Sequence, residues 1–143
     1  MNKQNTADEL CAVKLVERNK IYSEPLLIDL FKNEKLALTT LQGNYVINSR
    51  DVFEEKDYIY NIGPLCNGGD LRKLLNKRHG KPLPEKEARV IFRQMLLGMQ
   101  EMQKHHFVHR DLKPENTFIN DNVFKIADFG FCQVCKPGQT MDF

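Results

Sequence analysis

The chain lacks the long apolar stretches that a membrane protein or a secreted precursor needs. None of its apolar runs approaches the roughly 20 residues that cross a bilayer as a helix. Residues 1–6, MNKQNT, are polar, whereas a secretory signal requires an apolar centre. We therefore expect a cytoplasmic protein without an integral membrane segment.

A strong excess of charge is also missing. The 21 basic and 19 acidic residues leave a net charge of +2, with 41% hydrophobic and 28% charged residues. A charge so close to balance gives no reason to expect nucleic acid or a membrane surface as a partner, and the composition is that of an ordinary soluble domain. The short basic run at residues 77–81 is interpreted as a solvated surface in preference to an anion site.

Cysteines are too few and too scattered for a disulfide framework. The four lie at positions 11, 66, 132 and 135. Cys132 and Cys135 have the spacing of half a zinc site or of a redox pair, but no second pair lies nearby in the sequence to complete a tetrahedral set. Free thiols are the favoured interpretation, and a zinc or thiol protein stays open as a lesser alternative.

Two short motifs carry the chemical information. Residues 109–116 read HRDLKPEN, and residues 128–130 read DFG. Phosphoryl transfer from ATP needs a carboxylate that accepts the proton of the attacking hydroxyl, and hard oxygen ligands for Mg²⁺. Asp111 is the candidate for the first task. Asn116 and Asp128 are the candidates for the second, because a loop and a turn can bring all three side chains around one triphosphate.

With these motifs the chain resembles the eukaryotic protein kinases. Lys113, two residues after Asp111, is typical of the serine/threonine group. The resemblance implies ATP and Mg²⁺ as cofactors and a Ser or Thr hydroxyl of a protein substrate as acceptor. It makes Asp111, Lys113 and Asn116 catalytic, and it makes Asn116 and Asp128 metal ligands. His109 is interpreted as a packed, hydrogen-bonded scaffold residue and not as an acid or base.

Two further segments are similar to one branch of that family. Residues 66–71 read CNGGDL and residues 126–131 read IADFGF, as in the autophagy-initiating serine/threonine kinases. The resemblance extends from Leu10 to the end of the chain.

A lysine and a glutamate earlier in the chain are expected to form an ion pair. Lys14 lies inside the apolar run 10–16, and Glu34 lies on the apolar stripe of the next predicted helix. A charge at either buried position calls for an opposite charge, although Lys14 alone would also suit an exposed sheet edge. The kinase resemblance makes Lys14 the ligand of the α- and β-phosphates and Glu34 the residue that orients it.

The resemblance also locates the nucleotide. Main-chain groups near Leu65 and Cys66, at the join between two lobes, are expected to hold adenine. Pro64 stands where the family commonly carries an acidic residue, and Gly63 would guard the back of the pocket. The complete set of expected cofactor-binding residues is Ala12, Lys14, Glu34, Leu65, Cys66, Phe118 and Asp128.

The remaining patterns predict an α+β fold. Proline and glycine mark the turns, alternation marks the strands, and three-four spacing marks the helices. Strands are expected over residues 10–16, 44–53, 58–62, 117–120 and 123–127. Helices are expected from a Ser23 cap, over 70–78 with an Asp70 cap, and over 84–104. The first strand is expected to be buried, and residues 131–143 are expected to be flexible. Leu71, Leu74 and Leu75 of the second helix are expected to face inward, and the methionines of the third helix to fill the core.

Together these elements predict a two-lobed, protein-kinase-like fold that is truncated at both ends. Residues 1–64 would form the small lobe, a β-sheet with one helix, and residues 65–143 the start of the large lobe up to the activation segment. No glycine precedes Lys14, so the glycine loop over the phosphates is missing, as is the Ala-Pro-Glu end of the activation segment. We expect poor stability and little phosphoryl transfer from these 143 residues alone. The alternative function is a catalytically inactive, kinase-like binding module.

Overall fold

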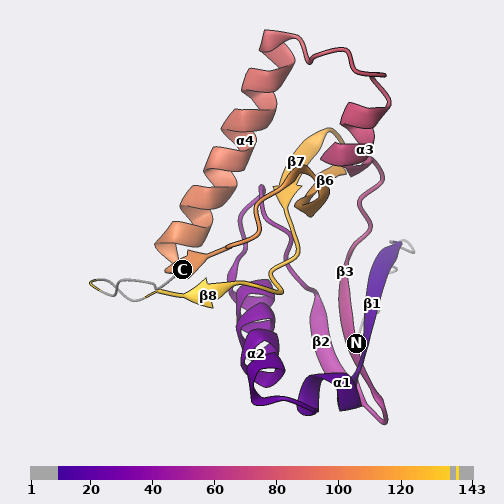
Figure 1. Cartoon of the computed structure of the whole chain (residues 1–143), viewed down its shortest axis with the longest axis vertical. Coiled ribbons are helices and arrows are strands. Elements are labelled where there is room, and N and C mark those ends of the chain that lie inside the picture. Colours follow the sequence, from indigo (N-terminus) through magenta and orange to yellow (C-terminus); the bar gives the residue numbers. More distant parts are fainter. Residues whose placement is uncertain (1–9, 136–137, 139–143) are drawn as a thin grey trace, which may run out of the picture.

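The computed structural model describes residues 10–135 and 138. The first part is a three-stranded antiparallel sheet in the order β1-β3-β2, with a short and a long helix beside it (Figure 1). The strands are β1 (Cys11–Glu17), β2 (Asp51–Glu55) and β3 (Tyr58–Pro64), and the helices are α1 (Arg18–Tyr22) and α2 (Pro25–Thr40).

The second part is mainly helical and holds the two motifs. Its helices are α3 (Leu71–Asn76), α4 (Glu85–Lys104) and the 3-10 turn η1 (Pro114–Asn116). Its strands are short: β4 (Gly69–Asp70), β5 (Phe107–Val108), β6 (Thr117–Asn120), β7 (Val123–Ile126) and β8 (Gln133–Val134). β4, β6 and β7 form one small sheet, and β5 pairs with β8. The predicted α+β, protein-kinase-like fold is confirmed, while the division at residues 64 and 65 stays a prediction.

Several element predictions are confirmed because local signals decide them. The carboxylate of Asp70 accepts a hydrogen bond from the Lys73 amide at 2.8 Å and caps α3. Asp121 and Asn122 both have positive φ, 48° and 62°, as the tight turn between β6 and β7 requires. α4 begins and ends within one residue of its predicted range.

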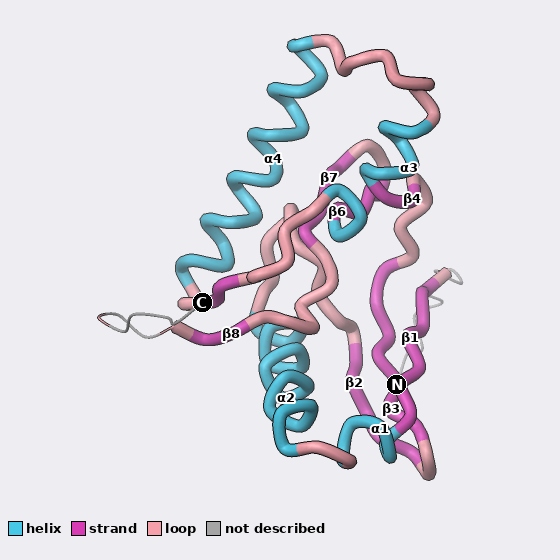
Figure 2. The backbone as a smooth tube through the Cα atoms, in the orientation of Figure 1, coloured by secondary structure: helices cyan, strands magenta, loops and turns pink. Residues whose placement is uncertain are grey.

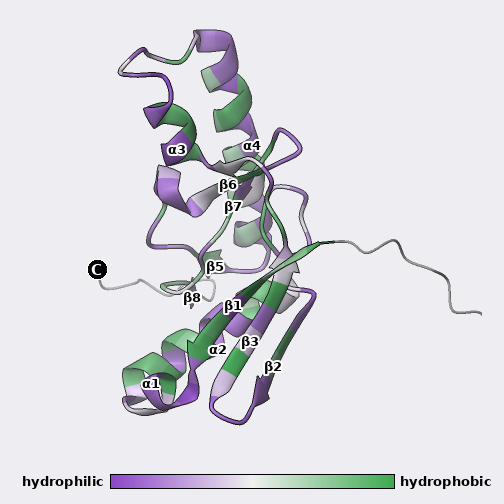
Figure 3. Ribbon diagram, turned by 90° about the vertical axis from the view of Figure 1, so that its right-hand side faces the viewer, coloured by the Kyte–Doolittle hydropathy of each residue, from purple (hydrophilic) through white to green (hydrophobic). Residues whose placement is uncertain are grey.

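The predicted burial of β1 is wrong. All its residues except Val16 are exposed, and the Lys14 side chain keeps 52% of its accessible surface. Within the described ranges β1 pairs with β3 alone, so one edge and much of the outer face meet solvent. Val13 and Leu15 are among the apolar side chains left exposed, 47% and 54%, on the strand coloured green in Figure 3.

The predicted Ser23 cap is also wrong. Glu24 is the N-cap of α2 and makes no side-chain cap bond, and Pro25 opens the helix. The Ser23 hydroxyl instead donates to the Lys20 carbonyl at 2.8 Å and so belongs to the end of α1. Pro25 alone sets the start of α2, because its fixed φ suits the first helical position.

Residues 44–50 do not form the expected first half of a strand. They run as a loop, drawn pink in Figure 2, up to the start of β2 at Asp51. Their backbone pairs with β7: the Ile126 amide donates to the Tyr45 carbonyl at 2.9 Å, and the Ile47 amide donates to the Ile126 carbonyl at 2.8 Å. This segment therefore joins the small sheet of the second part and ties the two parts together.

A cluster of buried apolar side chains lies between the two parts. It collects side chains from the end of α2, from the 41–47 segment and from the second part, including the Phe129 ring, which is fully buried. Its buried members are Ala37, Leu38, Leu41, Val46, Met102, Phe107, Ile126, Phe129 and Cys132. α2 is thus anchored by its last turns to the elements that carry the two motifs.

The core-filling role predicted for the methionines of α4 holds only in part, because the apolar stripe of this helix is partly exposed. Ile91 and Met102 are buried, but Phe92, Leu96 and Met99 are 65%, 43% and 42% exposed. β7 and β5 contact the helix, and these three side chains stay largely open to solvent. No helix within residues 10–135 is both long and apolar enough to span a bilayer.

Part of the segment expected to be flexible is paired with other backbone, namely residues 133–135. β8 pairs with β5 through Phe107–Val134 and Val108–Gln133, and the Cys135 amide donates to the His106 carbonyl at 2.7 Å. Short-range polarity suggested a loop, but pairing with a strand more than 20 residues away orders it. The rest of that predicted segment, apart from residue 138, lies outside the described residues.

Candidate active site

A buried histidine holds the catalytic-motif loop in place. His109 is 3% exposed, and its Nε2 lies 3.0 Å from the Ala127 carbonyl. The Asp111 amide donates to His109 Nδ1 at 3.2 Å, so Nδ1 is the acceptor and Nε2 carries the hydrogen. Burial lowers the pKa of His109, which keeps the ring neutral. The packed, hydrogen-bonded position predicted for His109 is confirmed.

Two residues of the motifs adopt left-handed backbone conformations. Arg110 has φ 66° and Asp128 has φ 62°, a region that non-glycine residues rarely occupy. The Arg110 guanidinium donates to the Phe131 carbonyl at 2.7 Å, which links the two loops. The Phe129 ring packs beside the His109 ring, with 5.6 Å between the ring centroids. This contact helps to hold the turn beside Asp128. Such conformations persist only where the surroundings hold them, and they often occur at functional sites.

Asp111, Lys113 and Asn116 form one hydrogen-bonded group. The Lys113 ammonium lies 2.6 Å from Asp111 Oδ2, and the Asn116 amide nitrogen donates to the same oxygen at 2.9 Å. The hydrogen bond from Lys113 is the main reason that the pKa of the Asp111 carboxyl lies below its ordinary value. The same bond raises the pKa of Lys113. Asp111 is therefore ionised at neutral pH and able to accept hydrogen bonds.

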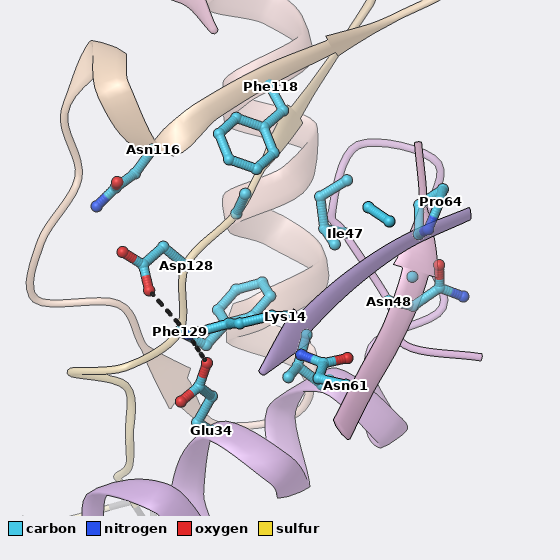
Figure 4. A pocket seen from close by; sticks show the side chains of 14 residues that line it. Lys14, Glu34, Ile47, Asn48, Asn61, Pro64, Asn116, Phe118, Asp128 and Phe129 are labelled. Atoms are coloured by element: carbon cyan, nitrogen blue, oxygen red, sulfur yellow. Dashed lines mark hydrogen bonds and ion pairs between the residues drawn. The ribbon is translucent and has the colours of Figure 1, made fainter. Parts of the chain in front are cut away.

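Lys14 and Glu34 form the predicted ion pair. Lys14 Nζ lies 2.6 Å from Glu34 Oε1 and 4.0 Å from Asp128 Oδ1. The Glu34 side chain is 16% exposed and Lys14 is about half exposed, so the lysine reaches from an open sheet face to a more enclosed carboxylate. Figure 4 shows the three side chains converging from β1, α2 and the DFG turn.

These residues line one end of a cavity of about 290 Å³ between the two parts. Asn116 and Asp128 bring hard oxygen atoms to the same cavity as the Lys14 ammonium. At the other end the walls are apolar or carry no charge. They include Ala12, Ile47, Asn48, Gly63, Pro64 and Phe118. The cavity is thus charged at one end and uncharged at the other.

Most predicted site residues meet at this cavity. Ala12, Lys14, Glu34, Asn116, Phe118 and Asp128 line it, and Asp111 adjoins it through Asn116. In the described structure the lining reaches Gly63 and Pro64 but not Leu65 or Cys66. The main-chain contacts expected at Leu65 and Cys66 therefore stay a prediction. Burial raises the pKa of the Cys66 thiol.

Sequence analysis missed several wall residues of the cavity, among them Asn61, Ile47 and Asn48. Asn61 lies directly opposite Lys14 in the register of β1 and β3. Its amide oxygen accepts from the Ser49 hydroxyl. Ile47 and Asn48 come from the loop that had been expected to be a strand. The alternation of β3 would have identified Asn61 once the register was known, but no local signal identifies Ile47 and Asn48.

The zinc or redox alternative for the two late cysteines gains no support. Cys132 is fully buried, and burial raises the pKa of its thiol to about 12, so it is protonated and unreactive at neutral pH. Across the described ranges no three side chains of the metal-binding types come together, and all four cysteines are free thiols. Cys132 is a core residue.

Comparisons with known proteins agree with this geometry. The family model described as the protein kinase domain matches residues 1–143. The serine/threonine-protein kinase ATG1a of Arabidopsis thaliana is 36% identical over 130 residues. That match covers 88% of this chain and 20% of the relative, so the chain spans about a fifth of the relative's length. The chain belongs to the protein kinase family, and its resemblance to the autophagy-initiating serine/threonine kinases is confirmed.

Proposed function

We propose that the chain carries the nucleotide site and the phosphoryl-transfer residues of an ATP- and Mg²⁺-dependent protein serine/threonine kinase. The observation that carries the proposal is the position of Asn116. It lines the same cavity as Lys14, Glu34 and Asp128, and its amide holds the Asp111 carboxylate. One residue thereby links the proposed proton acceptor to the proposed phosphate site.

The residues present fit Mg²⁺ and a triphosphate. Asn116 and Asp128 offer amide and carboxylate oxygens, the ligands that Mg²⁺ prefers, at one end of the cavity. Bound Mg²⁺ would neutralise charge on the phosphates as it develops. Lys14, held by Glu34, would add positive charge beside them.

The remaining residues would act on the acceptor hydroxyl. Asp111, whose carboxyl pKa Lys113 lowers, would orient a Ser or Thr hydroxyl and accept its proton. Lys113 would then touch the phosphoryl group in transfer, because it is already within hydrogen-bond distance of the Asp111 carboxylate. His109 would fix the loop without taking part in proton transfer.

Asp111→Asn tests the proposal. In a longer protein that adds a glycine loop before Lys14 and helices after the DFG segment, we expect transfer to fall by about 10²- to 10⁴-fold. The dissociation constant for ATP should change by less than about twofold, because Asp111 acts on the hydroxyl and not on the nucleotide. Initial rates with a Ser/Thr peptide and calorimetric titration with ATP and Mg²⁺ give the two readouts.

Asp29→Asn is the matched control. Asp29 is an exposed residue of α2 that pairs with Lys32, so the same substitution there should leave both readouts unchanged. Equal transfer rates in the unmodified protein and in Asp111→Asn would refute the catalytic assignment. ATP binding in both proteins with transfer in neither would favour the kinase-like binding module.

A further inference from the structure

The connecting segment, residues 65–68 between β3 and β4, is fastened to the turn between β6 and β7. The Asn67 amide nitrogen donates to Asp121 Oδ1 at 2.6 Å, and the Asp121 main-chain amide donates to Asn67 Oδ1 at 3.1 Å. The two residues are 54 positions apart in the sequence. A single side chain of the connecting segment therefore contacts this turn at two points.

The residue types at the two positions complement each other. Asp121 has φ 48°, a left-handed conformation that aspartate and asparagine tolerate better than most residues. An ionised carboxylate only accepts hydrogen bonds, whereas the main-chain amide of the same residue donates one. The Asn67 side chain carries one donor group and one acceptor group, so it matches both. An aspartate at position 67 would lack the donor and place a second negative charge beside Asp121.

Gly68 allows the connecting segment to approach β6 closely. A Cβ at position 68 would lie 2.7 Å from the Ile119 side chain, closer than real contacts allow. Without a side chain there, the Gly68 amide donates to the Ile119 carbonyl at 2.9 Å. Gly69 and Asp70 then continue along β6 as β4. The segment therefore lies directly against β6 and its turn.

The Asn67–Asp121 contact joins two segments that carry walls of the cavity. Pro64, three residues before Asn67, and Phe118, three residues before Asp121, both line the uncharged end (Figure 4). Pro64 is fixed from the other side, because it pairs with Cys11 in the register of β1 and β3. Since both segments are short, the contact between their ends also sets the distance between the two walls.

This contact is better suited to ordering a short segment than to stabilising the whole fold. Asn67 and Asp121 are both exposed, so water competes for their hydrogen bonds and the net gain in stability is small. A hydrogen bond to a carboxylate is nevertheless stronger than one between neutral groups. Two hydrogen bonds at one side chain also fix its direction, which restricts the backbone on either side of it.

We propose that Asn67 is a positioning residue for the base of the nucleotide and that it acts through Asp121. This step rests on the proposed function: the triphosphate would lie at the charged end of the cavity, so the base lies at the uncharged end. The Asn67–Asp121 contact holds the walls at Pro64 and Phe118 in place before the base enters. Such preorganisation strengthens binding because less ordering remains to be done when the ligand arrives.

The experiment measures binding of ATP with Mg²⁺ to the full chain by calorimetric titration, and binding of adenosine by its competition with ATP. We expect Asn67→Ala to weaken ATP by about 5- to 20-fold. Adenosine should weaken by the same factor, because the base is common to both ligands. The midpoint of urea unfolding should stay close to that of the unmodified chain. The Gly68 amide should exchange its hydrogen faster, which reports the loosened segment directly.

Exchanging the two side chains tests whether they act as a pair. Asn67→Asp alone should weaken ATP at least as much as Asn67→Ala, because it removes the donor and adds a repelling charge. In Asn67→Asp combined with Asp121→Asn, the side-chain amide at position 121 can donate to the carboxylate at position 67. The main-chain amide at position 121 can donate to it as well. This double variant should therefore bind ATP within about threefold of the unmodified chain.

Asn76→Ala is the matched control. Asn76 is an exposed residue at the end of α3 that does not line the cavity. The same substitution there should change neither the binding of ATP nor that of adenosine. It should also leave the exchange of the Gly68 amide unaltered.

Two results would overturn the inference and leave the nucleotide site intact. One is ATP binding by Asn67→Ala equal to that of the unmodified chain. The other is an ATP affinity that falls in Asn67→Ala while the adenosine affinity does not, which would place the effect at the phosphate end. By contrast, binding of neither ATP nor adenosine by the folded, unmodified chain would refute the nucleotide site itself and so the proposed function.

Discussion

Lys113 lowers the pKa of the Asp111 carboxyl. Its ammonium lies 2.6 Å from the Asp111 carboxylate and is the first cause of the lowered pKa of that carboxyl. We expect Lys113→Ala to raise the pKa of Asp111, because the charge-assisted hydrogen bond to the ionised form is lost. The carboxyl ¹³C chemical shift of Asp111, followed from pH 2 to 7, measures the change. Lys86→Ala, an exposed lysine of α4, is the control, and an unchanged Asp111 titration in Lys113→Ala would contradict the assignment.

His109 should make the fold sensitive to mild acid. Burial lowers its pKa in the folded chain, so below the ordinary value of 6.5 the unfolded chain binds a proton that the folded chain does not. Stability is therefore expected to fall as pH decreases from about 7 through 6.5 and toward the lowered pKa. His109→Gln should show a smaller loss between pH 7.5 and 5.5 in urea unfolding.

The control for that measurement is His79→Asn, which replaces an exposed histidine. It should keep the pH dependence of the unmodified chain. Carboxylates contribute little to the pH dependence of stability between pH 7.5 and 5.5, because their ordinary pKa values lie near 4. Equal pH dependence in His109→Gln and the unmodified chain would show that His109 is not held neutral by the fold.

At the scale of elements, the sequence predicted the helices and turns whose structure depends on neighbouring residues. The Asp70 cap, the Asp121-Asn122 turn and the long period of α4 are properties of a few neighbouring residues, and all three predictions are confirmed. The loop at residues 44–50 and the strand β8 were not predicted. Their backbone partners lie about 80 and 26 positions away in the sequence. Hydrogen bonds to distant strands override local propensity there.

The candidate site divides in the same way. Lys14, Glu34, Asn116 and Asp128 were identifiable because each belongs to a motif or to a charge placed against an apolar pattern. The uncharged wall was only partly identifiable. Asn48 enters it through a loop whose course depends on β7, and such a position leaves no mark in the local sequence.

Gly98 sets how closely α4 approaches the rest of the fold. A Cβ there would lie 2.6 Å from the Tyr45 carbonyl oxygen and 3.0 Å from the Ile126 side chain. Alanine favours an exposed helix by up to about 1 kcal/mol over glycine. At this position we expect Gly98→Ala instead to lower the free energy of unfolding by about 1–3 kcal/mol, because backbone must move to relieve the overlap.

Urea unfolding followed by circular dichroism measures that difference. Arg93→Ala, at an exposed position of the same helix, is the control and should change stability by less than about 0.5 kcal/mol. A Gly98→Ala variant as stable as the unmodified chain would mean that α4 and the 44–47 segment separate easily.

For the whole molecule, the exposed apolar surface of α4 is the feature most expected to cause association between copies. A groove of about 440 Å³ runs between this helix and the catalytic-motif loop, with Leu96, Met99 and Leu112 in its walls. Exposed apolar patches of this kind promote association between copies. We expect the full chain to associate as its concentration rises, and Leu96→Glu with Met99→Glu to shift it toward the monomer in light scattering.

The control for that prediction adds a charge elsewhere. Asn76→Glu alters an exposed polar residue at the end of α3 and should not change the association. If the Leu96 and Met99 substitutions leave the association constant unaltered, another surface is responsible, with the exposed edge of β1 the next to test.

Because α2 is held in the core by its last turns, a rigid tilt of this helix would rotate it about a point near Leu38. Ala37 and Leu38 are buried in the cluster shared by both parts, whereas the first three turns are exposed or half-buried. At about 1.5 Å per residue, Glu34 lies about 6 Å from the point near Leu38 and Pro25 about 20 Å. A tilt of about 10° would move Pro25 by about 3 Å but Glu34 by only about 1 Å. A displacement at the Pro25 end would therefore reach the Lys14–Glu34 pair strongly reduced.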